Sequence, residues 1–292
     1  MTASSDLTGT GVWSSALRYG DPAAAADAAA ELETLGYSAM WIPDVGGDLF
    51  AAIDTLLGAT SDTTVATGIL NLWLHDADET AARVHDFVQR HGRRLLVGIG
   101  VSHAALIDMK EPGRYDKPLT RMREYLDALD AAPEPLPVAD RVLAALGPRM
   151  LELARTRAAG SHPYLVTPDH TRRVRGALGV GPLVAPEQAV VLETDPTRAR
   201  ELARGHLAGY LALPNYANNW KRIGYTDDDV ANGGSDRLVD ALVAWGDDDA
   251  LLARVQEHRD AGADHVCIQV ITDDLMAPPL DEWRRLAPVL VG

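Results

Sequence analysis

The order of apolar and amphipathic segments predicts an α/β protein, a single (β/α)₈ TIM barrel that covers residues 1–292. Short apolar runs typical of buried strands alternate with longer amphipathic stretches typical of helices, and there are eight such runs. The length suits one large barrel. No glycine-rich phosphate turn follows the first run at residues 10–16, which disfavours an open doubly wound sheet.

The expected strands follow one another at regular intervals. They cover residues 10–16, 38–43, 64–72, 94–101, 141–145, 164–166, 188–193 and 264–271. The expected helices cover residues 22–35, 49–60, 79–91, 118–129, 149–157, 169–178, 196–213, 236–245, 247–261 and 281–289. Asp21-Pro22 and Asp195-Pro196 are typical helix starts, because Asp caps free amides and Pro fits the first helical position.

Two stretches interrupt this alternation and are expected to be irregular insertions at the C-terminal face of the barrel. The first runs from residue 102 to 116, and the second is the turn-rich stretch 215–229. Trp73, Tyr115 and the aromatic residues of the second stretch are expected either to line a pocket or to pack in the core.

Composition excludes several classes of function. A formal charge of −15 argues against a nucleic-acid or anionic membrane surface. No window approaches the length of apolar chain that spans a membrane, and residues 1–10 lack the features of a signal peptide. Cys267 is the sole cysteine and lies in an apolar run, so we expect a buried, inert thiol in a cytoplasmic protein that has no metal motif.

Barrel enzymes place their active sites at the C-terminal ends of the strands. The segment Gly147-Pro148-Arg149 joins an expected strand to a helix, and free amides with an adjacent arginine suit a phosphate group. The alternative is that Gly147 serves the turn and Pro148 only begins the helix. Gly98 and Gly100 likewise leave room for a flat ring, or else they mark close packing.

Three side chains at these strand ends could take part in chemistry or in ligand binding. His103 is the candidate general acid or base, and His162 is a weaker candidate for the same role. Asp44 could hold a ligand amide or hydroxyl, or it could cap the following helix.

The strand ends also carry a family resemblance. The segments concerned are 36–44 (GYSAMWIPD), 65–71 (VATGILN), 95–102 (LLVGIGVS), 146–150 (LGPRM) and 261–269 (AGADHVCIQ). Across nearly the whole chain the sequence resembles the luciferase-like monooxygenase superfamily, especially its coenzyme F420-dependent oxidoreductases.

The resemblance implies a bulge in the third strand, with a non-prolyl cis peptide at Gly68–Ile69 that supports and bends the coenzyme ring and so favours hydride transfer. It implies that Asp44 borders the ring. It also implies that two segments contact the coenzyme tail, namely Val101 and Ser102, and the turn of Gly147, Pro148, Arg149, Met150 and Leu151.

The sequence departs from the sugar-phosphate members of this family at two positions. Val45 stands where they have a histidine, and His103 stands where they have a glutamate. We therefore expect an F420-dependent oxidoreductase that acts on a different small organic molecule, with His103 assisting a proton. An FMN-dependent monooxygenase and a non-catalytic or cofactor-free flavin-binding barrel are the alternatives. A homodimer is expected by analogy with the family.

Overall fold

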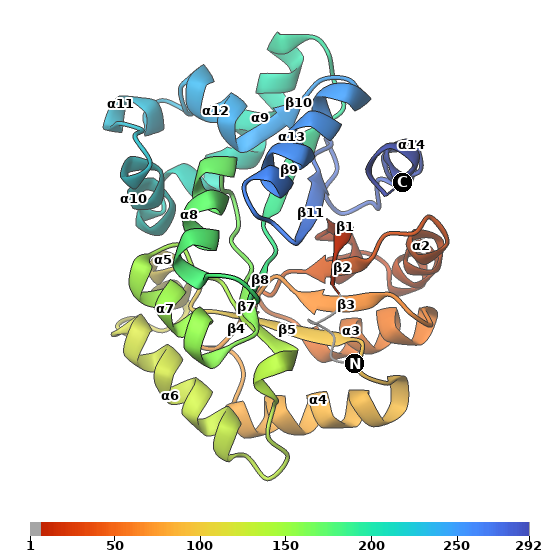
Figure 1. Cartoon of the computed structure of the whole chain (residues 1–292), viewed down its shortest axis with the longest axis vertical. Helices are drawn as coiled ribbons and strands as arrows, with labels where there is room; N and C mark the ends of the chain where they lie inside the picture. Colours follow the sequence, from red (N-terminus) through yellow and green to blue (C-terminus); the bar gives the residue numbers. More distant parts are fainter. Residues whose placement is uncertain (1–6, 292) are drawn as a thin grey trace.

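A parallel sheet curled into a barrel forms the centre of the molecule (Figure 1). The computed structural model describes residues 7–291. The strands are β1 (Gly9–Trp13), β2 (Ala39–Ile42), β3 (Thr64–Thr67), β4 (Leu70–Asn71), β5 (Leu95–Gly100), β6 (Arg141–Leu143), β7 (Gly160–Ser161), β8 (Leu183–Val184), β9 (Glu187–Val191), β10 (Val243–Trp245) and β11 (His265–Val270).

The ends of this sheet meet through one continuous segment of chain. The strand order is β10-β9-β11-β1-β2-β3-β5-β6-β7-β8, with β4 paired to β5. β8 and β9 lie next to each other in the sequence, yet β8 pairs with β7 whereas β9 pairs with β11. Hydrogen bonds from Asp264 N to Val184 O and from Cys267 N to Pro186 O extend the pairing between this segment and β11 as far as β8. The segment thus closes the sheet, and the predicted (β/α)₈ barrel is confirmed.

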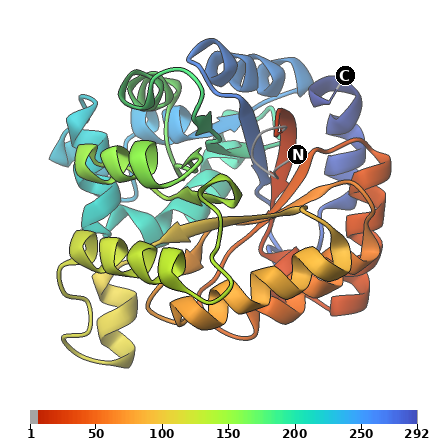
Figure 2. The ribbon, with the colours of Figure 1, turned by 60° about the horizontal axis from the view of Figure 1, so that its bottom comes forward.

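Helices cover the outside of the sheet, as the turned view in Figure 2 shows for the first half of the chain. The α-helices are α1 (Ala16–Tyr19), α2 (Pro22–Thr34), α3 (Leu49–Ala59), α4 (Ala77–His91), α5 (Ala104–Lys110), α6 (Pro118–Ala131), α7 (Pro148–Arg157), α8 (Pro168–Leu178), α9 (Pro196–Leu211), α10 (Pro214–Arg222), α11 (Asp227–Val230), α12 (Asp236–Leu242), α13 (Asp248–Asp260) and α14 (Leu280–Leu290). A 3₁₀ turn, η1, covers Val138–Asp140. No helix within residues 7–291 is long and apolar enough to cross a membrane.

The sixth strand differs from the expected one. The residues that pair are Gly160–Ser161, not 164–166. Leu165 has a φ of +51°, a left-handed conformation that no strand accommodates, and its amide donates to the carboxyl group of Glu187 rather than to a neighbouring strand. The apolar run Tyr164–Val166 therefore predicted burial correctly and secondary structure wrongly.

Both stretches expected to be irregular contain helices. In the second stretch, α10 begins at Pro214 and buries Tyr216 and Trp220, and the Trp220 indole donates to Leu165 O. In the first stretch, α5 follows His103 directly. Burial of one face outweighs the weak helix propensity of the Asn-rich sequence in α10.

Two helix boundaries also differ from the predicted ones. Helix α4 begins at Ala77, because Asp76 rather than Asp78 accepts the first free amides. The helix expected over 236–245 ends at Leu242, and the β-branched and aromatic residues that follow form β10 against β9.

The barrel interior holds neutral polar side chains among the apolar ones. The Trp41 indole donates to Nε2 of His265, and the Trp41 ring stacks on the His162 ring with 4.0 Å between the ring centroids. Burial lowers the pKa of His162 to about 4 and that of His265 to about 3, so both rings are neutral at pH 7. Cys267 is fully buried, as expected, and burial raises the pKa of its thiol.

Candidate active site

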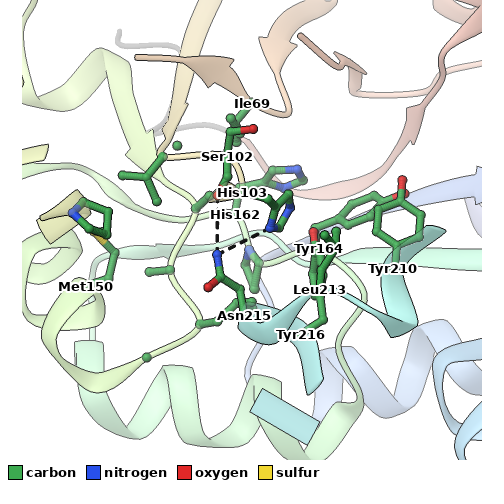
Figure 3. A pocket seen from close by; sticks show the side chains of 18 of the residues that line it. Ile69, Ser102, His103, Met150, His162, Tyr164, Tyr210, Leu213, Asn215 and Tyr216 are labelled. Atoms are coloured by element: carbon green, nitrogen blue, oxygen red, sulfur yellow. Dashed lines mark hydrogen bonds between the residues drawn. The ribbon is translucent and has the colours of Figure 1, made fainter. Parts of the chain in front are cut away.

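A cavity of about 860 Å³ opens at the C-terminal ends of the strands. Its lining includes ten residues singled out from the sequence: Asp44, Gly68, Ile69, Val101, Ser102, His103, Gly147, Pro148, Arg149 and Met150. His162 lines it too, whereas Leu151 does not and is packed in the hydrophobic core instead. Figure 3 shows Met150 on one side of this cavity and three tyrosines on the other, with Ser102 and His103 between them.

The bulge in the third strand shapes one wall of the cavity. Ala66 pairs with Leu96 and Leu70 pairs with Ile99, so the third strand has one residue more than its partner between these pairs. The peptide bond Gly68–Ile69 within the bulge is cis, as the resemblance implied. The Ile69 side chain thereby joins the lining of the cavity.

The two glycines of β5 accommodate this bulge in different ways. A Cβ at Gly98 would lie 2.0 Å from the backbone oxygen of Thr67, so Gly98 serves close packing of two strands. A Cβ at Gly100 would lie 2.5 Å from Cγ1 of Ile69. Gly100 therefore leaves the space that the Ile69 side chain occupies beside the cavity. The sequence did not distinguish the two glycines, whereas in the structure Gly98 serves close strand packing and Gly100 serves the position of Ile69.

Asp44 lines the cavity, but its carboxylate bonds neighbouring backbone amides and His75. Its oxygens accept hydrogen bonds from Gly46 N at 3.2 Å and Asn71 N at 3.1 Å, and one lies 2.9 Å from Nε2 of His75. The following helix, α3, is capped by Asp48 instead. Asp44 thus holds the end of β2 against β4. Sequence reasoning missed His75, since the contact spans 31 positions of the chain.

His103 stands at the start of α5 and faces the insertion that carries α10. The Nδ2 group of Asn215 lies 3.4 Å from both His103 Nδ1 and the backbone oxygen of Ser102 (Figure 3). Because an amide nitrogen only donates, Nδ1 of His103 accepts and the proton of the neutral ring lies on Nε2. Burial lowers the pKa of His103 below its ordinary value, which keeps the ring neutral at pH 7.

A cationic end of the cavity lies at the N-terminus of α7. Gly147 caps this helix without any side-chain hydrogen bond, and Pro148 begins it. Arg222 reaches the same place from α10, since a Cβ at Gly147 would lie 3.9 Å from its Nη1. Together with Arg149, the helix N-terminus and Arg222 suit a phosphate group. Arg222 was not predicted, because no local pattern connects it with Gly147.

Some of the aromatic residues that were expected either to line a pocket or to pack in the core line the cavity, and others are buried in the core. Tyr115 and Tyr216 line the cavity, whereas Trp220 is fully buried in the core behind it. Trp73 is also buried and donates its indole N–H to Val101 O, which supports the strand end from outside. Among residues 7–291 no group of His, Cys, Asp and Glu side chains is placed to hold a metal ion.

A parallel barrel whose strand ends enclose an apolar cavity beside an anion-binding helix N-terminus has the layout of an enzyme that binds a planar, phosphorylated cofactor. The sequence model for the luciferase-like monooxygenase family matches residues 3–265. The chain belongs to this family and is a luciferase-like flavin- or deazaflavin-dependent oxidoreductase.

Solved structures share the fold at low sequence identity. An F420-dependent secondary alcohol dehydrogenase in complex with an F420-acetone adduct is 14% identical, with a TM-score of 0.74 over 97% of this chain and 98% of that chain. The coenzyme F420-dependent tetrahydromethanopterin reductase from Methanopyrus kandleri is 17% identical, with a TM-score of 0.74 over 98% and 99%.

A third neighbour carries a different cofactor. The oxygenating constituent of 3,6-diketocamphane monooxygenase from Pseudomonas putida, a type II Baeyer-Villiger monooxygenase in complex with FMN, is 15% identical, with a TM-score of 0.68 over 97% and 96%. No curated protein matches the chain in sequence.

Proposed function

We propose that the protein is a coenzyme F420-dependent oxidoreductase that transfers a hydride between the deazaflavin and a small organic substrate. The observation that carries the proposal is the cavity itself, which joins an apolar wall at Ile69 and Val101 to a cationic end at Arg149 and Arg222. A planar ring with a phosphorylated tail requires both features in one cavity. The bound deazaflavin supplies the hydride chemistry.

The residues present fit such a coenzyme. Gly100 leaves space for Ile69 beside the ring position, and the N-terminus of α7 has no side chain competing for its first amides. Ile69, Val101 and Ser102 would hold the ring, while Gly147 and Arg149 would hold the phosphate. Asp44 would act indirectly, by fixing the loop that borders the cavity.

His103 would assist the reaction at the substrate oxygen. Its Nε2–H can donate a hydrogen bond to that oxygen and stabilise the charge that develops there during hydride transfer, while the ring stays neutral and the proton of the net reaction comes from solvent. The half-buried ring packs beside Tyr216, whose ring centroid lies 5.1 Å away. Residues of α10 thus orient His103 and cover it.

The structural neighbours support F420 as the first choice. The secondary alcohol dehydrogenase and the tetrahydromethanopterin reductase are both F420-dependent and superpose on this chain with a TM-score of 0.74. An FMN-dependent monooxygenase is the second candidate, favoured by membership of the luciferase-like monooxygenase family and by the FMN-bound neighbour.

Titration of the purified protein with F420 and FMN side by side tests the proposal, since the two absorb and fluoresce at different wavelengths. We expect saturable F420 binding at least about tenfold tighter than FMN binding, a difference of about 1.4 kcal/mol. Tighter binding of FMN than of F420 would instead indicate an FMN-dependent monooxygenase. If neither coenzyme binds, the chain is the cofactor-free barrel.

A further inference from the structure

The side of the cavity away from Met150 is formed by aromatic rings (Figure 3). Tyr210 comes from α9, Tyr216 from α10, and Tyr164 from the segment after β7. The ring centroids of Tyr164 and Tyr210 lie 5.6 Å apart, and those of Tyr210 and Tyr216 lie 5.5 Å apart. Leu213 lines the cavity next to them. We call these four residues the tyrosine wall.

The hydroxyl protons of two of these tyrosines are used within the protein. The Tyr164 hydroxyl donates to Oε1 of Gln269 at 2.8 Å. The Tyr210 hydroxyl lies 3.2 Å from that of Tyr164 and donates to it, because the Tyr164 proton is already engaged. These residues therefore offer the cavity their rings and not hydrogen-bond donors.

The tyrosine wall carries no formal charge. Among the residues that line the cavity, the Asp, Glu, Lys and Arg side chains are Asp44, Arg149 and Arg222. The Asp44 carboxylate is bound by backbone amides and His75, and the two arginines lie at the α7 end. An ionic molecule at the tyrosine wall would lose its hydration without gaining a counter-charge, which disfavours its binding.

We propose that the tyrosine wall binds a neutral, mainly apolar ring compound whose single carbonyl or hydroxyl group faces His103. The inference rests on the proposed function, because it names the substrate class of the same site. Aromatic rings at the observed spacing favour a flat or alicyclic body through face and edge contacts. His103 lies beside the wall, with its ring centroid 5.1 Å from that of Tyr216, and its Nε2–H is placed to meet the one polar function.

Three matched ketones test the substrate class: acetophenone, para-acetylbenzamide and para-acetylbenzoate. Their affinities are measured by calorimetry and by saturation-transfer NMR, on the protein with and without the coenzyme that it binds. We expect acetophenone to bind at least about tenfold more tightly than the carboxylate, with the amide between them. Equal or tighter binding of the carboxylate overturns the proposal, and so does a failure of acetophenone to bind.

Two variants place the preference at the tyrosine wall. Leu213→Arg introduces a cation there and is expected to improve para-acetylbenzoate binding by about tenfold and to weaken acetophenone binding. Val138→Arg adds the same charge at an exposed site before β6, at the opposite end of the barrel strand, and leaves both affinities unchanged. Equal effects of the two variants overturn the assignment.

Tyr210→Phe keeps the ring and removes only the hydroxyl, so it remains informative if Leu213→Arg does not fold. Acetophenone affinity is expected to stay within about twofold, because the hydroxyl proton is engaged by Tyr164. A loss of about tenfold or more would show that the hydroxyl binds ligand, contrary to the proposal. If neither F420 nor FMN binds, the proposed function fails, while the preference among the ketones is still decided on the unloaded protein.

Discussion

The contact between Gly98 and the strand-three bulge gives a sharp prediction about stability. In Gly98→Ala the new Cβ would lie 2.0 Å from Thr67 O, and 3.2 Å from the carbonyl carbon. A backbone oxygen cannot rotate away as a side chain does, so the two strands must move apart by about 1 Å. We expect a fall of about 3 kcal/mol in the free energy of unfolding, at the upper end of the range for overpacked sites.

Urea unfolding followed by far-UV circular dichroism measures this change, with a melting temperature lowered by about 5 °C as a second readout. Gly205→Ala is the matched control. Gly205 lies within α9 with nothing within 4 Å of a built Cβ, so alanine should stabilise the helix by about 0.5–1 kcal/mol. If Gly98→Ala unfolds at the same urea concentration as the wild type while Gly205→Ala is stabilised, the argument from close strand packing is refuted.

Gly100→Ala extends the same reasoning to the cavity. Its Cβ would meet the Cγ1 and Cδ1 atoms of Ile69, at 2.5 and 2.6 Å, and these atoms can move. We expect a smaller loss of stability, about 1 kcal/mol, and a coenzyme affinity reduced by about tenfold because Ile69 is displaced. A larger loss of stability than in Gly98→Ala would contradict the distinction between a backbone contact and a side-chain contact.

Three further predictions concern side chains that face the cavity or the barrel interior. Asn215→Ala removes the donor to Nδ1 of His103, so ¹⁵N NMR should show both ring tautomers in place of one, and turnover should fall by about tenfold. Unchanged ¹⁵N shifts would count against this role. Burial raises the pKa of Glu187 to about 8, above its value in the unfolded chain. The contribution of Glu187 to stability is therefore complete below about pH 4.5 and declines as the pH rises to 8. Thermal melts of Glu187→Gln should lack this decline. Arg222→Gln should weaken the binding of a phosphate-bearing coenzyme about fivefold and reduce the salt dependence of binding. Arg123→Gln, at an exposed position of α6, is the control and should change neither. Equal effects of the two variants would exclude a direct contact between Arg222 and the coenzyme.

Local signals accounted for the framework of the fold and for one half of the cavity. Caps such as Asp21 and Asp195 begin helices where expected, since their hydrogen bonds join residues three positions apart. The part of the cavity lined by Gly68, Ser102 and Gly147 follows equally from local sequence, because these residues stand at strand ends that a barrel brings to one face. These features depend on neighbours along the chain, which is what a sequence pattern records.

The elements that the sequence did not predict depend on distant contacts. Leu165 leaves the extended conformation while its amide bonds Glu187, and its carbonyl accepts from Trp220, 55 positions away. Asn215 reaches Ser102 O across 113 positions. No periodicity or capping signal encodes such pairs, because each forms only when segments that are distant in the sequence meet in the fold.

The two sides of the cavity, the strand ends and the tyrosine wall, are therefore built from different parts of the fold. This difference determines which substitutions can change what each side binds. The side of the cavity opposite the tyrosine wall consists of strand ends and the backbone turn at Gly147, with Arg222 of α10 beside that turn. The tyrosine wall consists of side chains from the segment after β7, from α9, from α10 and from the turn between these two helices, and α10 is anchored by the Trp220 indole bond to Leu165 O. Substitutions that preserve this anchor can alter the wall without disturbing the barrel. We therefore expect substitutions in α10 and its surroundings to change the choice of substrate, and substitutions at the ends of β3, β5 and β6 to change the affinity for the coenzyme.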